Sequence, residues 1–313
     1  MPEISQKQLV GARRTLSGLK MNLGGKIFWR LKFLILESWK KAPEVIILSL
    51  FSAGKRSADG LFEFLDRKKI ISCNLKDNFF RYKNYSFHYG KNRAIGDTIA
   101  DFISIWGQDS VYLKNNFLDN SAYNFEPPYE DGRVKIANSD YVIDAGANIG
   151  LFSLMAGEKV GVGGKVFAFE PIKITHEVLL KNISGNLAKN VKVYDFALGE
   201  SEKDLKFSLP DSLGDSSGFF KGDYPEENVK QSTIDRLVQK GEIEKVDFIK
   251  ADIEGMERDM IKGAKETIMK FKPKLSVRVY HRPDDPRVIK DLIKSFVPEY
   301  NIKITLDNLY AWV

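Results

Sequence analysis

The stretch Tyr141-Val-Ile-Asp-Ala-Gly-Ala-Asn-Ile-Gly150 decides the fold of this chain. A short β-rich run ends at Asp144, a glycine-rich turn follows it directly, and the sequence predicts a helix from Leu151. Glycines let the backbone turn tightly and approach a ligand, and the start of a helix offers free N–H groups to a polar or anionic group. A carboxylate at the end of the strand can hold an ammonium group or accept hydrogen bonds from a ribose. The turn therefore predicts a ligand-binding edge.

On the carboxyl-terminal side of this turn, β-rich runs alternate with stretches of helical length. This alternation favours a parallel sheet with helices on both faces. The predicted strands are Tyr141–Asp144, Lys165–Glu170, Val191–Asp195, Val246–Lys250 and Leu275–Tyr280, and the predicted helices are 151–160, 174–188, 256–271 and 285–296. A short extra strand is expected at 204–210, followed by a small-residue loop at 211–218. We place the domain boundary at the turn-rich segment 126–132, so that a mainly helical basic region, 1–125, precedes the sheet domain, 126–313.

A second acidic residue follows the next predicted strand. Glu170 precedes Pro171 and lies 26 residues after Asp144. An acidic side chain about 20 residues beyond a glycine-rich turn typically binds the ribose hydroxyls of a nucleoside. The alternative is that Glu170 caps a helix beginning near Ile172. The turn does not match the dinucleotide fingerprint, because Asn148 occupies the second glycine position, which argues against a nicotinamide-dependent oxidoreductase or epimerase.

Six segments between residues 137 and 313 resemble, in order, the motifs of the FkbM-type methyltransferases. They are Asp144-Ala-Gly-Ala-Asn-Ile-Gly150, Phe169-Glu-Pro171, Ala197-Leu-Gly199, Thr233-Ile-Asp-Arg-Leu237, Phe248-Ile-Lys-Ala-Asp-Ile-Glu-Gly-Met-Glu257 and Tyr280-His-Arg-Pro-Asp284. The resemblance implies a class I enzyme that uses S-adenosylmethionine, in most cases to methylate hydroxyls of sugars and natural products. It also implies a Rossmann-like, mostly parallel sheet of seven strands with one antiparallel strand, so that residues 126–313 would form the cofactor-binding methyltransferase domain.

The same resemblance assigns residues to the cofactor. The glycine-rich turn would surround the methionyl part, Glu170 would hold the ribose, and the stretch from Asp195 to Ala197 would border the adenine. The residues assigned to the cofactor are Asp144, Gly146, Asn148, Gly150, Glu170, Asp195, Ala197 and Asp252.

Three polar side chains are candidates for the chemical step, because each follows a predicted strand at the same sheet edge. Asp252 and Glu254 follow the fourth strand, and His281 follows the fifth. An aliphatic hydroxyl is about as weak an acid as water, with a pKa of roughly 15.7, so a base must accept the proton as attack proceeds. His281 is the first choice for this catalytic base because neutral histidine accepts a proton near pH 7. Its alternative role is a structural hydrogen bond to Asp284 or Asp285.

Asp252 is the second candidate for the base, and it could instead contact the cofactor or position the substrate. A cation held by Asp252 and Glu254 would lower the pKa of the hydroxyl. Two carboxylates two residues apart are too weak a signal for a metal site, so the sequence assigns none. We read His88 and His176 as non-catalytic.

Composition limits the remaining possibilities. The 313 residues are 43% hydrophobic and 29% charged, which is typical of a soluble globular protein. The one cysteine excludes an internal disulfide, and the three histidines show no metal-ligand spacing. No apolar run reaches the ~20 residues of a membrane span, and the first residues lack the apolar region of a secretory signal. We therefore expect a cytoplasmic protein.

The net charge of +6 is concentrated at the amino-terminal end. Residues 1–60 carry eleven Lys and Arg against four Asp and Glu, a balance of +7, and the other residues sum to −1. A basic segment of this kind suggests peripheral contact with the inner face of a membrane or with an acidic glycan, although it is also typical of a solvated helical surface. The near-neutral body disfavours a nucleic acid partner.

The sequence therefore predicts an S-adenosylmethionine-dependent O-methyltransferase that acts on a hydroxyl of a sugar, a glycan or glycolipid, or a natural product. Two alternatives stay open at this point. One is the nicotinamide-dependent enzyme, and the other is a non-catalytic membrane or glycan adaptor that uses the basic segment.

Overall fold

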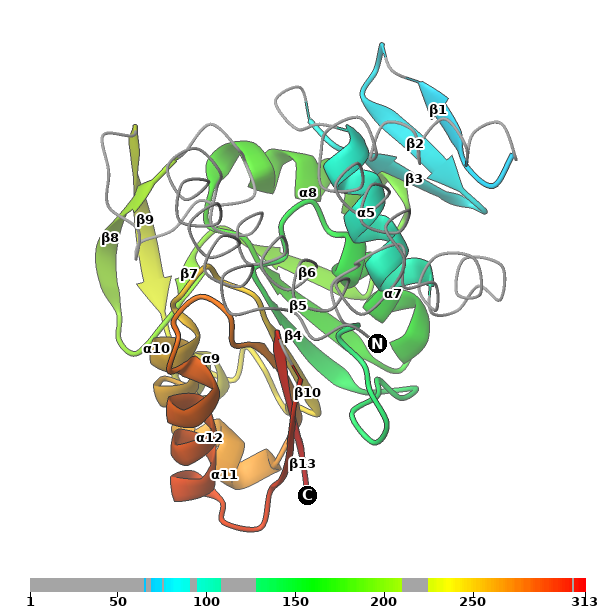
Figure 1. The fold of residues 1–313 in the computed structure, drawn as a ribbon. Coiled ribbons are helices and arrows are strands. Elements are labelled where there is room, and N and C mark those ends of the chain that lie inside the picture. Colours follow the sequence, from blue (N-terminus) through cyan, green and yellow to red (C-terminus); the bar gives the residue numbers. More distant parts are fainter. Residues whose placement is uncertain are drawn as a thin grey trace, which may run out of the picture.

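A seven-stranded sheet forms the centre of the molecule (Figure 1). The structure is a computed structural model, and it describes residues 65, 69–74, 76–90, 95–107, 128–209, 225–305 and 307–313. The strand order is β6-β5-β4-β10-β11-β13-β12, in which β13 runs antiparallel to both neighbours and all other pairs are parallel. The strands are β4 (Tyr141–Ala145), β5 (Lys165–Phe169), β6 (Val191–Tyr194), β10 (Phe248–Ala251), β11 (Lys274–Arg278), β12 (Asn301–Ile304) and β13 (Asn308–Trp312). This order and the single antiparallel strand confirm the predicted class I methyltransferase sheet.

Helices cover both faces of this sheet, as predicted (Figure 1). The central strands β4 and β10 are apolar almost throughout, because both of their faces are buried. On one face lie α7 (Leu151–Val160) and α8 (Lys173–Gly185), and on the other lie α9 (Ile234–Gln239), α10 (Glu257–Lys262), α11 (Lys265–Phe271) and α12 (Asp285–Phe296). Each face therefore has its own hydrophobic core.

One predicted helix is two helices in the structure. The sequence predicts a single helix over 256–271, but α10 ends at Lys262 and α11 begins at Lys265. Gly263 lies between them, and a Cβ atom there would come within 1.9 Å of the carbonyl oxygen of Gly199. The backbone at Gly263 therefore packs directly against the backbone at Gly199, which only a residue without a side chain allows.

A second sheet, of three strands, lies beside the carboxyl edge of the first. It is formed by β7 (Ala197–Leu198), β8 (Lys203–Ser208) and β9 (Glu226–Ser232), in the order β7-β9-β8. Strand β8 confirms the short extra strand expected in this region. The small-residue loop expected at 211–218 lies outside the described residues.

The part upstream of the main domain contains a third sheet and a helix. The sheet consists of β1 (Ser72–Asn74), β2 (Phe79–Tyr82) and β3 (Tyr85–His88), and the helix is α5 (Ile95–Trp106). The ring nitrogen of Trp106 donates a hydrogen bond of 2.9 Å to the carbonyl of Leu151, at the start of α7. The basic segment 1–60 lies outside the described residues, and so does most of the region 1–125 that the sequence predicts to be mainly helical.

Two asparagines at the end of α8 attach strand β3 to the main domain. Asn182 lies in the last turn and Asn186 is the C-cap residue, and because they are four residues apart their side chains lie on the same side of the helix end. The amide of Asn186 accepts from the N–H of Ser86 at 2.7 Å and donates to its carbonyl at 2.7 Å. Asn182 makes the same pair of bonds with His88, at 2.7 and 2.9 Å. The two side chains satisfy the outer edge of β3 as a neighbouring strand would.

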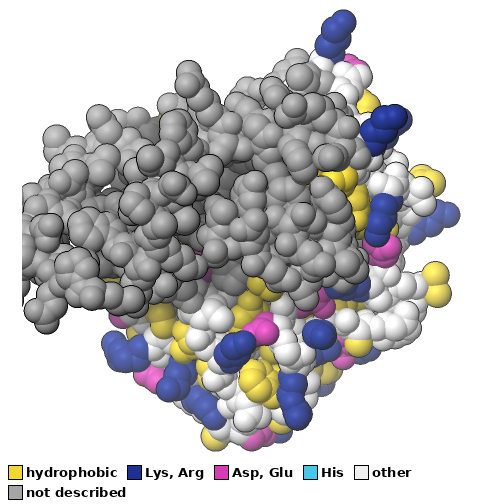
Figure 2. All heavy atoms as spheres, turned by 45° about the vertical axis from the view of Figure 1, so that its right-hand side comes forward, with side chains coloured by type: hydrophobic (Ala, Val, Ile, Leu, Met, Phe, Trp, Pro, Cys, Tyr) yellow, Lys and Arg dark blue, Asp and Glu magenta, His cyan; other side chains and the backbone are white. Residues whose placement is uncertain are grey.

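The described surface is of mixed charge. Figure 2 shows one face, on which Lys and Arg side chains alternate with acidic and apolar ones. Among the described residues, no helix has both the length and the apolar character needed to cross a bilayer.

Candidate active site

A cavity lies at the carboxyl ends of β4, β5 and β10. From β4 the chain continues to β5 and β6 on one side, whereas β10 and β11 lie on the other. Ligands of open α/β sheets bind at such a point, where the strand order reverses. Of the residues predicted from sequence, Gly146, Asn148, Glu170, Ala197 and Asp252 line this cavity.

The carboxylate of Glu170 is the anchor of one end of the cavity. One of its oxygens accepts the N–H of Asn148 at 2.9 Å, and the other accepts the N–H of Ile172 at 3.0 Å. Ile172 is the residue that begins α8, so Glu170 satisfies the helix start and faces the cavity as well. Burial raises the pKa of Glu170 to about 7, although the two N–H donors and the nearby charge of Lys250 act in the opposite direction.

The glycine-rich turn needs its unusual backbone angles. Gly146 has a φ of +75°, and a Cβ there would lie 1.9 Å from the carbonyl oxygen of Asp252. Asn148 has a φ of +51°, which asparagine tolerates better than most residues. Gly150, at φ +90°, begins α7 and faces Leu179 instead of the cavity. The turn thus packs on the loop after β10 and directs the N–H of Asn148 towards Glu170.

Asp144 lies behind the cavity and not in its lining. Its side chain is fully buried, accepts a hydrogen bond of 2.6 Å from the hydroxyl of Ser153 and lies 2.9 Å from the ammonium of Lys250. The same ammonium donates to the carbonyls of Ala145 and Gly146, at 3.2 and 2.7 Å. Asp144 therefore does hold an ammonium group, as its position suggested, but the group belongs to the protein itself. The ion pair of Asp144 and Lys250 thus holds the backbone of the glycine-rich turn in place.

Apolar side chains form the other wall of the cavity near Glu170. Ile172, Ala197, Phe207 and Met256 form a small buried cluster there. This apolar surface is suited to a flat heteroaromatic ring. Asp195, which the resemblance places beside the adenine, is exposed and is not part of the lining.

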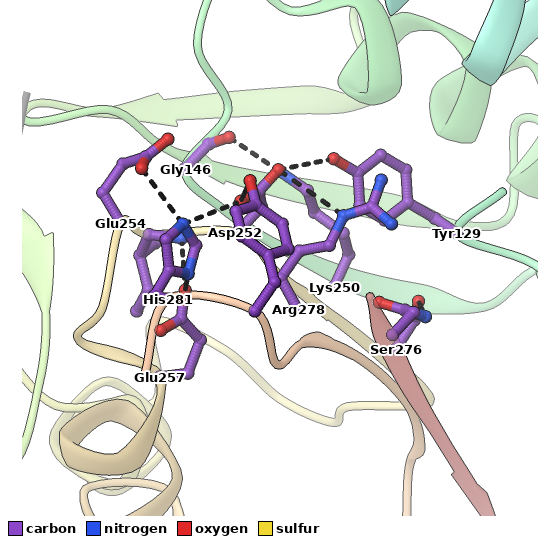
Figure 3. A network of polar contacts seen from close by, with 12 residues as sticks. Tyr129, Gly146, Lys250, Asp252, Glu254, Glu257, Ser276, Arg278 and His281 are labelled. Carbon is purple, nitrogen blue, oxygen red and sulfur yellow. Dashed lines mark hydrogen bonds and ion pairs between the residues drawn. The ribbon is translucent and has the colours of Figure 1, made fainter. Parts of the chain in front are cut away.

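An acidic cluster with a histidine borders the cavity at the loop after β10, and Figure 3 shows its side chains. Asp252 and Glu254 line the cavity after β10, and His281 reaches them from the segment after β11. One ring nitrogen of His281, Nε2, lies 3.0 Å from Glu254 and 4.0 Å from Asp252. The other, Nδ1, lies 3.1 Å from Glu257, in the first turn of α10.

The surroundings of His281 favour its protonated form. Burial by itself lowers the pKa of the imidazole, but the carboxylates of Glu257 and Glu254 outweigh it and raise the pKa to about 10. A protonated imidazole has no lone pair with which to accept a proton. Asp252, by contrast, lines the cavity and accepts a hydrogen bond of 2.8 Å from the hydroxyl of Tyr129.

Several residues that line the cavity were not predicted from sequence, among them Tyr129, Lys250 and Arg278. The guanidinium of Arg278 lies 4.3 Å above the ring of Tyr129, and its Nε is 3.7 Å from Asp252. Tyr129 comes from the segment before the sheet, where no motif marks it. Lys250 carried a signal, because a lysine within an otherwise apolar central strand needs a buried anion.

Comparison with known proteins identifies the family of the chain. The family model of the methyltransferase FkbM domain matches residues 144–301, about half of the chain. The chain belongs to the FkbM methyltransferase family. The methyltransferase sdnD of Sordaria araneosa is 26% identical over 55% of this chain and 77% of its own length. The hexuronic acid methyltransferase AglP of Haloferax volcanii is 27% identical over 50% of this chain and 62% of its own length.

A solved FkbM methyltransferase from Methylobacillus flagellatus is 27% identical, with a TM-score of 0.47. The similarity covers 60% of this chain and 48% of that one, so the chain spans about half the length of that relative. Family membership confirms the resemblance seen in the sequence and the assignment to the methyltransferases. The matched segment includes every residue assigned above to the cofactor and to the chemical step.

Proposed function

We propose that this FkbM-family enzyme binds S-adenosylmethionine in the cavity and transfers its methyl group to a hydroxyl oxygen. The observation that carries the proposal is the carboxylate of Glu170, held by the N–H groups of Asn148 and Ile172 at one end of the cavity. Each carboxylate oxygen has a further lone pair, so a ribose diol can donate one hydrogen bond to each oxygen.

The residues of the cavity fit the rest of this cofactor. The apolar cluster around Ile172 and Phe207 suits the adenine ring. On the other side of Glu170, the backbone of the turn at Gly146 and Asn148 leaves room for a thin chain such as the methionyl part. The cofactor residues expected beyond these, Asp144, Gly150 and Asp195, would act through the position of the turn or the rim, since none lines the cavity.

When bound, the cofactor supplies an electrophilic methyl on a sulfonium, and attack by the acceptor oxygen forms the O–C bond as the C–S bond breaks. The contribution of this chain is to orient the acceptor and take its proton. Asp252 lies in the lining between the turn and Glu254, so its carboxylate can accept the hydroxyl proton during attack. His281 in this arrangement is a positioning residue, because its Nε2 is hydrogen bonded to Glu254 and its Nδ1 lies 3.1 Å from Glu257. The earlier prediction that His281 is the base stays a prediction.

For the acceptor, a sugar or glycan hydroxyl is the class that we favour. Its support is the relative AglP, which is a hexuronic acid methyltransferase. A natural-product hydroxyl also fits a cavity whose acceptor end is lined by Tyr129 and Asp252.

A cytoplasmic location and a membrane contact through residues 1–60 remain part of the proposal.

Calorimetry with S-adenosylhomocysteine tests the cofactor. Wild-type protein should bind it, and Glu170→Ala should lose about 1.5 to 3 kcal/mol for each charge-assisted hydrogen bond removed. Glu177→Ala, an exposed acidic position on helix α8, which follows Glu170, is the matched control and should bind like the wild type. If the wild type bound neither S-adenosylhomocysteine nor S-adenosylmethionine, the proposal would fail.

A further inference from the structure

We infer that Asp252, Glu254 and His281 form a binding site for one divalent transition-metal cation at the acceptor end of the cavity. One ligand atom from each residue lies within 4.8 Å of the other two. Two carboxylate oxygens and an imidazole nitrogen are a donor set that suits Mn²⁺, Fe²⁺ or Zn²⁺. The sequence did not assign this site, because two carboxylates two residues apart are a weak signal, and the third ligand lies 27 residues beyond Glu254.

The orientation of His281 points to a ligand at Nε2. Metal-bound histidines typically donate the other ring N–H to a carboxylate, which fixes the tautomer and the ring. Glu257 occupies the place of such a carboxylate here: its side chain is 1% exposed, and Oε1 lies 3.1 Å from Nδ1. With Nδ1 beside Glu257, Nε2 faces Glu254 and Asp252, as Figure 3 shows.

Glu257 also fixes the loop that carries the two carboxylates. Its Oε1 accepts the N–H of Ile253 at 2.9 Å, and Ile253 is the residue between Asp252 and Glu254. One buried carboxylate thus orients all three ligands. The exposed fractions of the ligands decrease from 14% and 13% for Asp252 and Glu254 to 3% for His281. The site is therefore closed on the protein side and open towards the cavity.

A cation would take the place of a proton in this cluster. Asp252, Glu254 and Glu257 bring three carboxylates together around His281, and the guanidinium of Arg278 lies 3.7 Å from Asp252. A metal ligand must be deprotonated, so a cation at Nε2 would displace the proton that the imidazole otherwise shares with Glu254. Lys250 is not part of the cluster, because it pairs with Asp144.

A cation in this position would serve the acceptor. Asp252 and Glu254 line the same cavity as Gly146 and Asn148, so the cation would lie where a hydroxyl must approach the methyl donor. Coordination of that hydroxyl would lower its pKa and orient its oxygen, with Asp252 beside it to take the proton. This role rests on the proposed methyl transfer, whereas the binding of the cation does not.

Titration of the full chain with Mn²⁺, followed by electron paramagnetic resonance of the free ion, tests the site. We expect one saturable site per chain, with or without S-adenosylhomocysteine. Electron spin echo spectra of the bound ion should show coupling to an imidazole nitrogen, and His281→Gln should abolish that coupling. Glu257→Gln, which disturbs the orientation of the ligands, should weaken Mn²⁺ binding about 10- to 100-fold.

A second ligand variant guards against misfolding. Glu254 has a φ of +53°, a backbone conformation that glycine adopts without strain, so Glu254→Gly removes the carboxylate and should fold. We expect at least a tenfold loss of Mn²⁺ affinity in this variant. The matched control is Asp259→Asn on α10, whose carboxylate is 37% exposed and lies outside the cavity lining; it should bind like the wild type.

Two results would overturn the site. One is a wild type without saturable Mn²⁺ binding, and the other is a Glu254→Gly variant that binds Mn²⁺ as tightly as the wild type does. Failure of the cofactor proposal would look different, because S-adenosylhomocysteine binding would then be missing from calorimetry while the Mn²⁺ site was intact.

Discussion

Lys250 lies directly beside Asp144 in the parallel pairing of β10 with β4, and their side chains form an ion pair of 2.9 Å. The exposed fractions are 4% for Lys250 and 0% for Asp144. The lysine also donates to two carbonyls of the glycine-rich turn. The pair joins the two central strands at the point where the turn leaves the sheet, and it therefore positions the backbone that faces the proposed cofactor.

Loss of one partner should therefore cost far more than loss of both. Lys250→Met leaves the Asp144 carboxylate buried without its cation, and we expect a loss of about 3 to 5 kcal/mol in the free energy of unfolding in urea. The double variant Asp144→Asn with Lys250→Met should recover part of that loss, because no charge is left unpaired. The control is Lys165→Met, which breaks the exposed pair with Glu244 and should cost much less than Lys250→Met, because water screens the exposed charges. Equal losses for the two lysines would contradict the role of burial.

The raised pKa of Glu170 should make stability depend on pH. Its ordinary value is 4.5 and its value in the fold is about 7, so the folded protein binds this proton more tightly than the unfolded chain does. The stability from this group is present below about pH 4.5 and is lost as the pH rises through 7, a change on the order of 3 kcal/mol. Unfolding of ligand-free protein at pH 5 and pH 8 measures it. In the Glu170→Gln variant, the part of the stability difference between pH 5 and pH 8 that comes from this carboxyl group should be absent.

S-adenosylhomocysteine should show the opposite dependence on pH. A ribose diol donates to the ionised carboxylate of Glu170, so binding should weaken as the pH falls below about 7. Calorimetry between pH 5.5 and 8.5 follows this dependence. An affinity that is constant over this range would show that Glu170 does not receive the diol.

Sequence patterns were sufficient to predict a site residue where one strand and the turn that follows it determine the position of that residue. The turn after β4 and the carboxylate after β5 belong to neighbouring parallel strands, so Gly146, Asn148 and Glu170 had to meet at one edge. The boundaries of α7 and α12 were also predictable, because glycine-rich turns flank α7, and Asp-Pro at the start and apolar spacing define α12.

The remaining contacts depend on register and on helix placement. Lys250 meets Asp144 only because β10 pairs with β4 in one register, and the sequence does not encode that register locally. His281 is oriented by Glu257, which begins a helix between the two strands that carry the cluster. The break at Gly263 likewise follows from a contact with Gly199 that is distant in sequence. These features were therefore missed or given other roles.

The asparagine clamp on β3 should link the upstream sheet to the turn of the active site. Asn182 is fully buried and donates to the carbonyl of Ile149 at 2.7 Å, in addition to its two bonds with His88. Asn182→Ala leaves these backbone groups without partners, at about 1 to 3 kcal/mol for each group that stays buried. Urea unfolding should show the loss, and hydrogen exchange should be faster at the amide of His88.

A second asparagine provides the comparison for this clamp. Asn186 is only partly buried, so water can replace its amide, and Asn186→Ala should cost less than Asn182→Ala. It should accelerate exchange at Ser86 and leave His88 less affected. If Asn182→Ala unfolded at the same urea concentration as the wild type, β3 would be held by its apolar contacts alone.

The glycine-rich turn should tolerate no side chain at Gly146. A methyl group there would meet the backbone oxygen of Asp252 at 1.9 Å, so the turn or the loop after β10 has to move.

Gly132 is a matched control, because its φ of +54° is also left-handed but nothing lies within 4 Å of its Cβ position. Gly132→Ala should show only the backbone strain, about 1 to 2 kcal/mol, and should bind S-adenosylhomocysteine normally. Gly146→Ala should lose more stability than this and should also lose affinity for S-adenosylhomocysteine, measured by urea unfolding and calorimetry. Because the two variants share the strain, the difference between them measures the contact between the turn and Asp252; equal behaviour would mean that this contact does not hold the cavity in shape.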